Sequence, residues 1–379
     1  MTKEFVSFVR DLYRTTNFIP LHAPIFQGNE RKYVNDTLDS SFVSSVGEYV
    51  NKSEELMQSF TNSTKAIAVV NGTAALTISL KAIGVNYGDE VITQALTFVA
   101  TANAIVHVGA EPVFLDVDYD TMGLSPMALE SFLTEYAEIR GESTYNKKTG
   151  KKIAACVPMH TFGFPVKIDE LVAICSKWNI PVLEDTAESL GSYYKGKHTG
   201  TFGTLAAFSF NGNKIVTSGG GGMVITDDIT LGKHIKHLTT TAKIPHPYEF
   251  VHDEIGYNFR MPNLNAALLC GQLEQLENFL LIKRNIAVEY ENLFKNSAIK
   301  FRTEKENSRA NYWLMCVELD SLNERDNFLK ETNDNGVMTR PIWKLLYKLT
   351  MFKNCYRDSQ KSAEYLESRI VNIPSSVFS

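Results

Sequence analysis

Short apolar runs alternate with segments of helical periodicity through the first two-thirds of this 379-residue chain. Such an alternation predicts an α/β fold with a mainly parallel central sheet, because a helix between two strands lets them run in parallel. The expected strands are Ala66–Val70, Glu90–Thr93, Pro112–Val117, Ile153–Met159, Pro181–Leu183, Ala206–Phe210 and Gly222–Thr226. The helices expected between them include Thr73–Ile83, Met127–Ala137 and Ile168–Trp178.

A longer helical pattern begins at Asn263 and continues to about Phe294, with apolar residues at three- and four-residue steps. The pattern after it is mixed. We therefore expect a large domain over residues 1–262, and a linking helix with a smaller C-terminal α/β domain over residues 263–379. A polar segment, Gly141–Lys152, predicts a solvent-exposed insertion between a helix and a strand.

Four polar residues fall at or just beyond the carboxyl ends of predicted strands: Asn71, His160, Asp185 and Ser209. Open α/β sheets bind their ligands at this edge. The pattern therefore predicts a site there, with His160 in a supporting position because a lone histidine is more often structural.

The composition narrows the class of partner. Apolar residues make up 44% and charged residues 21%, which is typical of a packed core. The net charge of −5 and the pI of about 6.0 argue against nucleic acid or an anionic membrane as a partner. No apolar stretch approaches the roughly 18 residues of a membrane span, and no secretion signal is visible. The five cysteines are widely spaced, which argues against disulfides or a metal site and indicates a reducing cytoplasm.

The strongest chemical signal is Lys214, on a loop that follows an apolar strand ending near Ser209. Four glycines, Gly219–Gly222, follow and let the backbone pass close to a bulky group. A loop lysine usually points into water. Here an amine beside a hydroxyl and backbone donors can instead form a Schiff base with an aldehyde cofactor that carries a phosphate.

Two other segments support this chemistry. The apolar run Ile180–Leu183 continues into Glu184 and Asp185, and a carboxylate there can keep the ring nitrogen of pyridoxal phosphate protonated. Glu184 alternates to the other side of the strand, where we expect a structural role. The segment Asn71–Leu76 reads as a turn and a helix start, which is an anion site.

Several motifs in the same order resemble the DegT/DnrJ/StrS family of pyridoxal-phosphate-dependent nucleotide-sugar aminotransferases. They cover roughly residues 20 to 350 and are Asn71–Leu76, Thr97–Asn103, Glu184–Gly191, the Lys214 loop and Gly256–Pro262. Phe42–Gly47 and Val251–Asn258 resemble more narrowly the members that serve legionaminic acid and bacillosamine pathways. The resemblance implies an aspartate-aminotransferase-like (fold type I) large domain with a small C-terminal domain. It also implies glutamate as amino donor and a homodimer with shared active sites.

The resemblance assigns catalysis to Lys214 and Asp185. It implies that pyridoxal 5'-phosphate is bound by Gly72, Thr73, Phe98, Asp185, Glu188, Ser209, Lys214 and Asn258. Phe98 would stack on the ring; Gly72, Thr73 and Ser209 would bind the phosphate.

Two of these assignments differ in kind. Many relatives have glutamine where this chain has Glu188, beside the phenolic oxygen of the cofactor. The glutamate must then be protonated, face the substrate or be offset by a donor. Asn258 would reach the phosphate bound by the neighbouring subunit.

Ser44, Arg260 and Arg340 are the expected substrate contacts, the arginines through charge-assisted bonds to a diphosphate. Surface ion pairing is the alternative for both arginines.

The predicted function is transfer of an amino group from glutamate to a nucleotide-linked 4-keto-6-deoxy sugar, with UDP-4-keto-6-deoxy-N-acetylhexosamine as the expected acceptor, for a bacterial surface glycan such as lipopolysaccharide. A pyridoxamine-dependent sugar dehydratase is the nearest alternative, but those relatives have histidine in place of the lysine. A nicotinamide oxidoreductase is disfavoured because Gly219–Gly222 does not open a helix. A non-catalytic regulatory protein of the same fold remains the third alternative.

Overall fold

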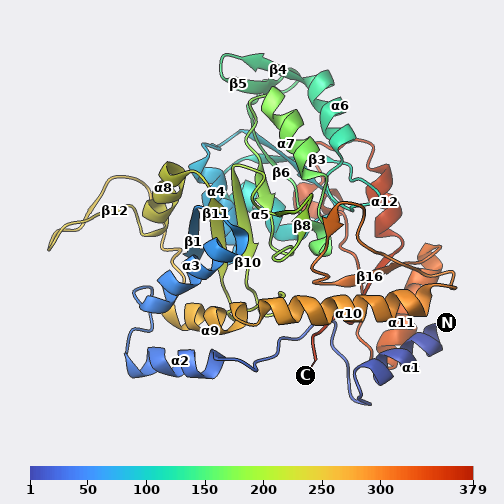
Figure 1. Ribbon diagram of the computed structural model, residues 1–379. Helices are drawn as coiled ribbons and strands as arrows, with labels where there is room; N and C mark the ends of the chain where they lie inside the picture. Colours follow the sequence, from blue (N-terminus) through green and yellow to red (C-terminus); the bar gives the residue numbers. More distant parts are fainter. Residues whose placement is uncertain (379) are drawn as a thin grey trace.

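A mixed, mostly parallel sheet forms the centre of the molecule in the computed structural model, which describes residues 1–378 (Figure 1). Across the sheet the strands follow the order β1, β11, β10, β7, β6, β2, β3, with parallel bridges joining β7 to β6. β11 runs antiparallel to β1 and β10, whereas the other neighbours pair in parallel. The strands are β1 (Lys65–Val69), β2 (Glu90–Gln94), β3 (Glu111–Leu115), β6 (Ile153–Val157), β7 (Leu183–Asp185), β10 (Leu205–Ser209) and β11 (Gly222–Thr226). The predicted α/β class is confirmed.

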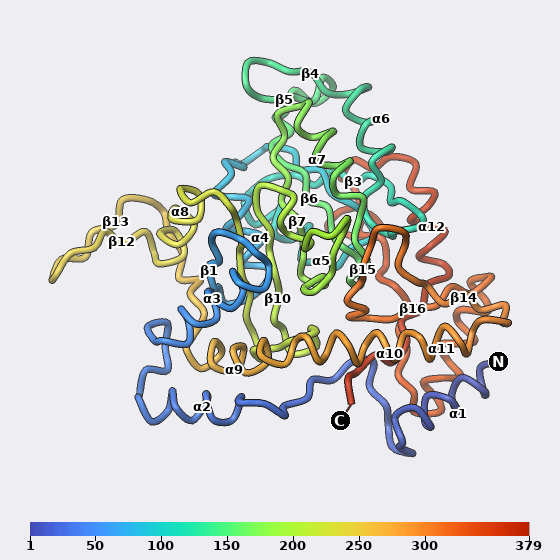
Figure 2. The backbone as a smooth tube through the Cα atoms, viewed as in Figure 1, coloured from blue at the N-terminus to red at the C-terminus, as the bar shows by residue number. Residues whose placement is uncertain are grey.

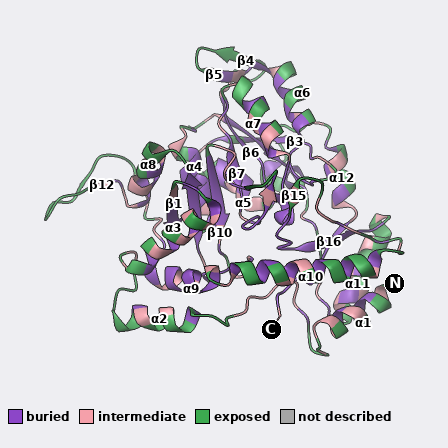
Figure 3. Ribbon diagram, viewed as in Figure 1, coloured by how far each residue is buried: buried purple, intermediate pink, exposed green. Residues whose placement is uncertain are grey.

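Alternate residues of each strand pack into different cores, as the two-residue period of a strand requires. On β1, Ile67 and Val69 join a core with the helices of one face, and Ala66 and Ala68 join the core on the other face. Figure 3 shows the strands buried between exposed helix surfaces. The helices around this sheet are α3 (Glu48–Thr61), α4 (Gly72–Ala82), α5 (Val99–His107), α6 (Pro126–Tyr136), α7 (Ile168–Lys177) and α8 (Ile229–Thr239).

Predicted and observed strand bounds differ most at β7. The expected strand was Pro181–Leu183, but the pairing with β10 begins at Leu183 and continues to Asp185. Proline has no N–H for a ladder, so Pro181 contributes only its carbonyl, which accepts from the amide of Cys156. The consequence is that Glu184 and Asp185 are themselves held in the sheet.

The single long helix predicted from Asn263 to Phe294 is wrong. The chain forms two helices, α9 (Asn263–Leu273) and α10 (Leu276–Phe294), which lie nearly end to end (Figure 1). At the junction the amide of Gln275 bonds to the carbonyl of Gln272, three residues back, so one tight turn interrupts the α-helical ladder.

The segment Gly141–Lys152 is only partly the exposed insertion that its polarity predicts. It completes a hairpin of β4 (Ala137–Arg140) and β5 (Ser143–Asn146). Thr144 and Asn146 are buried, and the Asn146 amide donates to Glu90 at 2.8 Å. Hydrogen bonding inside the fold thus accounts for polar residues that composition alone assigns to solvent.

The C-terminal part contains a second sheet of order β14, β16, β18, β17. Its pairs are antiparallel and place Arg340 opposite Asn372. The elements are β14 (Lys300–Phe301), β16 (Met315–Glu318), α11 (Leu322–Asp334), β17 (Arg340–Pro341), α12 (Lys361–Glu367) and β18 (Ile370–Ile373). The N-terminal helix α1 (Thr2–Leu12) packs here too, since Phe5 and Phe328 of α11 have ring centroids 5.1 Å apart.

The remaining elements are peripheral. Helix α2 (Glu30–Asp39) lies along α9, and a small sheet combines β8 (Tyr193–Tyr194), β9 (Lys197–His198) and β15 (Ser308–Arg309). A hairpin of β12 (Lys243–Ile244) and β13 (Val251–His252) projects from the body (Figure 2). Across the described residues 1–378, none of the helices is long and apolar enough to cross a membrane.

Candidate active site

A cavity of about 620 Å³, called the main cavity below, lies between the carboxyl ends of the central strands and the C-terminal sheet. The central strands and their loops contribute Asn71, Gly72, Thr73, Phe98, Thr101, Asp185, Glu188, Ser209, Asn211 and Lys214. The C-terminal part contributes Trp313, Leu314, Arg340, Ile342, Trp343, Lys344 and Asn372. Three of the four polar residues predicted to mark this edge therefore line one cavity. His160, the fourth, is buried behind it.

One end of the cavity is built to bind an anion. Asn71 caps α4 by accepting from the amide of Ala74 at 2.8 Å. The preceding amides, those of Gly72 and Thr73, have no partner within the helix because they belong to its first turn. A Cβ on Gly72 would lie 2.8 Å from the Cβ of Ser209, so glycine lets the Ser209 side chain approach this turn. Two amides, a hydroxyl and the helix dipole together suit a phosphate.

Asp185 lies at the end of β7 and is 2% exposed. The Thr101 hydroxyl donates to Oδ2 at 2.7 Å, and the Ala187 amide donates to Oδ1 at 3.1 Å. Burial raises the pKa of Asp185 despite these two bonds. None of the ion pairs between described residues includes Asp185, so its carboxylate faces the cavity without a cation of its own.

Glu184, the neighbour of Asp185, points to the opposite face of the strand. Its oxygens accept from the amides of Gly200, Phe202 and Gly203 and lie 3.0 Å from His160 Nε2. Burial raises the pKa of Glu184, but the bonds to His160 and the amides outweigh burial, and the net shift is downward. Glu184 and His160 thus lie outside the cavity lining and contact each other behind it.

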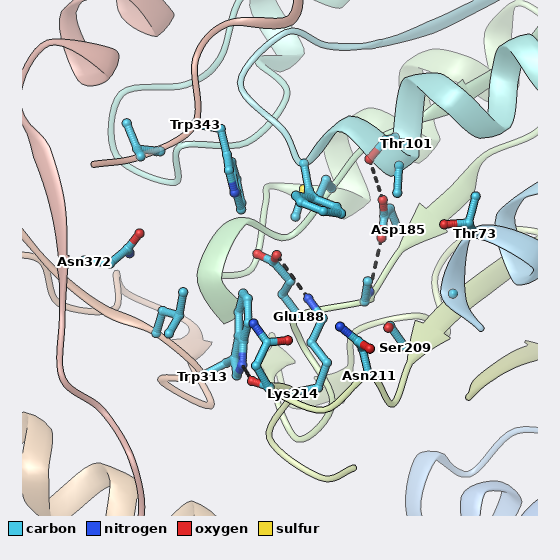
Figure 4. A pocket seen from close by; sticks show the side chains of 18 of the residues that line it. Thr73, Thr101, Asp185, Glu188, Ser209, Asn211, Lys214, Trp313, Trp343 and Asn372 are labelled. Carbon is cyan, nitrogen blue, oxygen red and sulfur yellow. Dashed lines mark hydrogen bonds and ion pairs between the residues drawn. The ribbon is translucent and has the colours of Figure 1, made fainter. Parts of the chain in front are cut away.

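Lys214 reaches the centre of the cavity and points toward Glu188 (Figure 4). Its Nζ lies 3.3 Å from Glu188 Oε1 and 3.9 Å from the centre of the Trp313 ring. The Glu188 side chain is almost fully buried, and the Phe162 amide donates to its Oε2 at 2.8 Å. Burial raises the pKa of Glu188 to about 7, although the charge of Lys214 opposes this shift. Glu188 can therefore change its protonation state near neutral pH.

The wall beneath Lys214 is a bend around Trp313 that several hydrogen bonds hold in place. Trp313 Nε1 donates to the carbonyl of Asn213, beside Lys214, at 2.7 Å. Tyr312, before Trp313, has a φ of 51°. The fully buried Lys283 of α10 donates from Nζ to the carbonyls of Tyr312, Trp313 and Ser375. This contact ties the Trp313 wall to the helix behind it.

Phe98 also borders the cavity. Its ring is about half exposed, and its centroid lies 6.4 Å from that of Trp343. Trp343 packs in turn on Phe162, at 4.7 Å. The cavity therefore has aromatic surfaces on both the central and the C-terminal side.

Three predicted site residues do not line the cavity of their own chain. Ser44 is exposed, and its carbonyl accepts from the Asn263 amide. Asn258 is exposed beside Thr240, at the base of the projecting hairpin. Arg260 borders a separate shallow depression together with Lys243 and His246.

The sequence reading missed Trp313, Trp343 and Asn372. The chain has three tryptophans, and two of them line the cavity, so their rarity was one available signal. Trp343 also follows the predicted contact Arg340 by three residues. Asn372 gave no signal, because only the pairing of β17 with β18 brings it beside Arg340.

The cavity combines a phosphate site, a buried carboxylate without a cation and a lysine. Together these groups fit an aldehyde cofactor with a phosphate and a basic ring nitrogen. The fold and this set define the class of pyridoxal-phosphate enzymes of fold type I.

Comparisons with known proteins agree. The model of the DegT/DnrJ/EryC1/StrS aminotransferase family matches residues 24–377, so the chain belongs to this family. It is 36% identical over 358 residues to a GDP-perosamine synthase of Escherichia coli O157:H7, covering 94% of this chain and 93% of the relative. It is 34% identical over 366 residues to a GDP-perosamine synthase of Vibrio cholerae, with 94% of each covered. The solved structure of Spr1654 from Streptococcus pneumoniae, in its PLP form, superposes on this chain with a TM-score of 0.83 at 25% identity. The match covers 94% of this chain and 93% of that one.

The cofactor is therefore pyridoxal phosphate, as in the family, and the reaction class is amino transfer in sugar biosynthesis. The narrower resemblance to legionaminic acid and bacillosamine enzymes is not reflected in the names of these two relatives.

Proposed function

We propose that this protein moves the amino group of glutamate onto the keto carbon of a nucleotide-linked 4-keto-6-deoxy sugar. The observation that carries the proposal is the position of the Lys214 amine, between Glu188 Oε1 at 3.3 Å and the Trp313 ring at 3.9 Å, inside a cavity that also contains Asp185. An enclosed lysine with a buried carboxylate close by suits repeated proton transfer.

Pyridoxal phosphate, when bound, supplies an electron sink for the substrate carbon that loses a proton. The amides of Gly72 and Thr73 and the hydroxyl of Ser209 would hold its phosphate. Asp185, whose pKa burial raises, would gain a cationic partner in the protonated ring nitrogen. Phe98 would lie against the ring.

Lys214 is the proton carrier of the reaction. Its Nζ would take the proton from the α-carbon of glutamate and return it to the carbon on the other side of the donor nitrogen. The same transfer in reverse would serve the sugar ketone. When Nζ is not engaged with the cofactor, Glu188 and the Trp313 ring hold it in the cavity. Nearby apolar and aromatic walls keep bulk water away from the reacting atoms.

Two acceptor classes have specific support. The names of the two relatives favour a GDP-linked sugar. The resemblance of Phe42–Gly47 and Val251–Asn258 favours UDP-4-keto-6-deoxy-N-acetylhexosamine, in legionaminic acid or bacillosamine biosynthesis. The two acceptor classes differ in the 2-acetamido group of the sugar and in the base of the nucleotide, so one panel of nucleotide-linked sugars separates them.

In the test, the purified enzyme is incubated with glutamate and with UDP- or GDP-linked 4-keto-6-deoxy sugars. The amino sugar product is detected by mass spectrometry. Glutamine and aspartate serve as alternative donors. Conversion of a single nucleotide class identifies the acceptor. Absence of any amino sugar, with the cofactor fully bound, would overturn the proposal.

We further propose a cytoplasmic homodimer in which the sites are shared. Ser44, Asn258 and Arg260 lie outside the cavity of their own chain, and a neighbour's cavity is the place where they would act. Mixing the inactive Lys214→Ala and Asn258→Ala proteins should restore activity, because one composite site of a mixed dimer is then intact. Lack of recovery after proven subunit exchange would mean that each site lies within one chain.

A further inference from the structure

Asn372, in the middle of β18, is 3% exposed and lines the main cavity. Its Nδ2 has no hydrogen-bond partner among the described residues. Figure 4 shows its amide directed into the cavity, across from Asp185 and Ser209. A buried amide without a partner is unfavourable, because it has given up its bonds to water without gaining others.

The surroundings of Asn372 explain why no protein group satisfies it. The neighbouring lining residues Leu314, Ile342 and Trp343 present apolar or aromatic surface. Its cross-strand partner Arg340 is itself a donor and already bonds to Asn333 and to the carbonyl of Thr339. The wall therefore offers donors and apolar surface to whatever enters.

The position of this wall restricts what can enter. The phosphate end and Asp185 occupy the central-sheet side of the cavity, so the side formed by β17 and β18 faces the substrate rather than the cofactor (Figure 4). A substrate that reacts beside Lys214 shares one cavity with this wall, so its nearest polar substituents are the groups that can reach it. In the amino donor these are carboxylate oxygens, and in the sugar they are hydroxyl or acyl oxygens.

We propose that Asn372 is a specificity-determining residue that donates a hydrogen bond from its side-chain amide to an acceptor oxygen of the bound substrate, next to the reacting carbon. The inference rests on the proposed function and extends it to the substrate side of the site. A neutral amide suits a site that two different substrates occupy in turn, because it can donate to a carboxylate and can either donate to or accept from a hydroxyl. A site built to hydrogen-bond its substrate discriminates strongly against molecules that lack the matching group.

The first experiment measures thermal melting of the holoenzyme without substrate. Asn372→Leu, similar in size, removes the unpaired amide and should leave the melting temperature unchanged or raise it. Asn146→Leu is the matched control, since Asn146 is equally buried but its amide donates to Glu90 at 2.8 Å. That control should lower the melting temperature. A fall of similar size in Asn372→Leu would mean that the amide has a structural partner, and would overturn the proposal.

The second experiment measures stabilisation by ligands that cannot react. Glutarate carries the carboxylates of the donor without its amine, and UDP-N-acetylglucosamine and GDP-mannose carry no ketone. At least one of them should raise the melting temperature of the wild type but raise that of Asn372→Leu by much less. Asn146→Leu should respond like the wild type.

The third experiment follows each half-reaction in a single turnover through the change in cofactor absorbance. Asn372→Leu and Asn372→Asp should lower the second-order rate constant about 10- to 100-fold with at least one substrate. A loss with glutamate identifies a donor carboxylate as the acceptor, and a loss with the keto sugar identifies a sugar oxygen. If the donor carboxylate is the acceptor, Asn372→Asp should be worse than Asn372→Leu, because like charges repel.

Unchanged rates in both half-reactions together with unchanged ligand stabilisation would refute the role of Asn372. A wild type that aminates no sugar would refute the proposed function instead, and the two melting experiments would still decide on Asn372.

Discussion

Glu188→Gln provides the sharpest test of the electrostatics of this site. The substitution keeps the shape of the side chain and removes its charge. Burial raises the pKa of Glu188 from 4.5 to about 7 in the folded protein. Because the group is nearly fully buried, this shift corresponds to about 3 kcal/mol of differential interaction.

The sign follows from proton linkage. Between pH 4.5 and about 7 the folded protein binds more protons at Glu188 than the unfolded chain does. Stability from this group is therefore greatest below pH 4.5 and decreases as the pH rises through the folded pKa. From about pH 5.5 to about pH 8.5 the wild type should lose about 2 kcal/mol of unfolding free energy that Glu188→Gln retains.

The assay is urea unfolding of the cofactor-free protein at several pH values, with the variant compared with the wild type at each one. Glu184→Gln is the control. Its pKa is lowered below 4.5 in the folded state, so its stabilisation is lost only at more acidic pH. The difference between that variant and the wild type should be constant across the same range. A constant difference for Glu188→Gln as well, or one that changes in the opposite direction, would refute the reasoning about Glu188.

Three other substitutions test separate parts of the site. Lys214→Ala should bind cofactor but lose turnover, and borohydride should attach the cofactor to Lys214 in the wild type; peptide mass spectrometry that finds the adduct on another lysine would contradict this. Asp185→Asn should slow amino transfer by about two to three decades, the equivalent of roughly 3–4 kcal/mol, whereas Glu184→Gln should affect the rate far less. If single-turnover rates showed the reverse order, Asp185 would be excluded as the partner of the ring nitrogen. Burial lowers the pKa of Lys283 from 10.5 to about 7. Between these pH values the unfolded chain binds more protons, so the stability of the wild type should rise with pH. Lys283→Met should lose that rise in urea unfolding, and an unaltered slope of stability against pH would contradict the burial argument.

The residues that sequence reasoning placed correctly share one property: their position follows from local chain geometry. The two-residue period of β7 separates Glu184 from Asp185, and the strand-turn-helix pattern places Gly72 at a helix N-terminus. Lys214 follows β10 at short range. In each case a few consecutive residues determine which side chains face the cavity.

The residues that sequence reasoning missed depend on long-range pairing. Asn372 faces Arg340 only because two strands about thirty residues apart pair in one register. Trp313 lies under Lys214 because Tyr312 adopts a left-handed backbone and Lys283 binds its carbonyl, which no local pattern predicts. The break between α9 and α10 has a local cause, but the apolar pattern continues across it and so gives no sign of the change in backbone bonds.

The attachment of the Trp313 wall to α10 through Lys283 has a consequence for how substrate range can evolve in this scaffold. One lysine nitrogen bonds to the carbonyls of Tyr312, Trp313 and Ser375, so it ties together the helix, the indole wall and the C-terminal segment. Widening the cavity by shifting this wall would leave several buried carbonyls without donors, a cost that a single substitution does not recover. New substrates are therefore more accessible through exchange of side chains on β17 and β18 than through changes in backbone position. Libraries aimed at altered sugar specificity should vary that sheet and leave Lys283 unchanged.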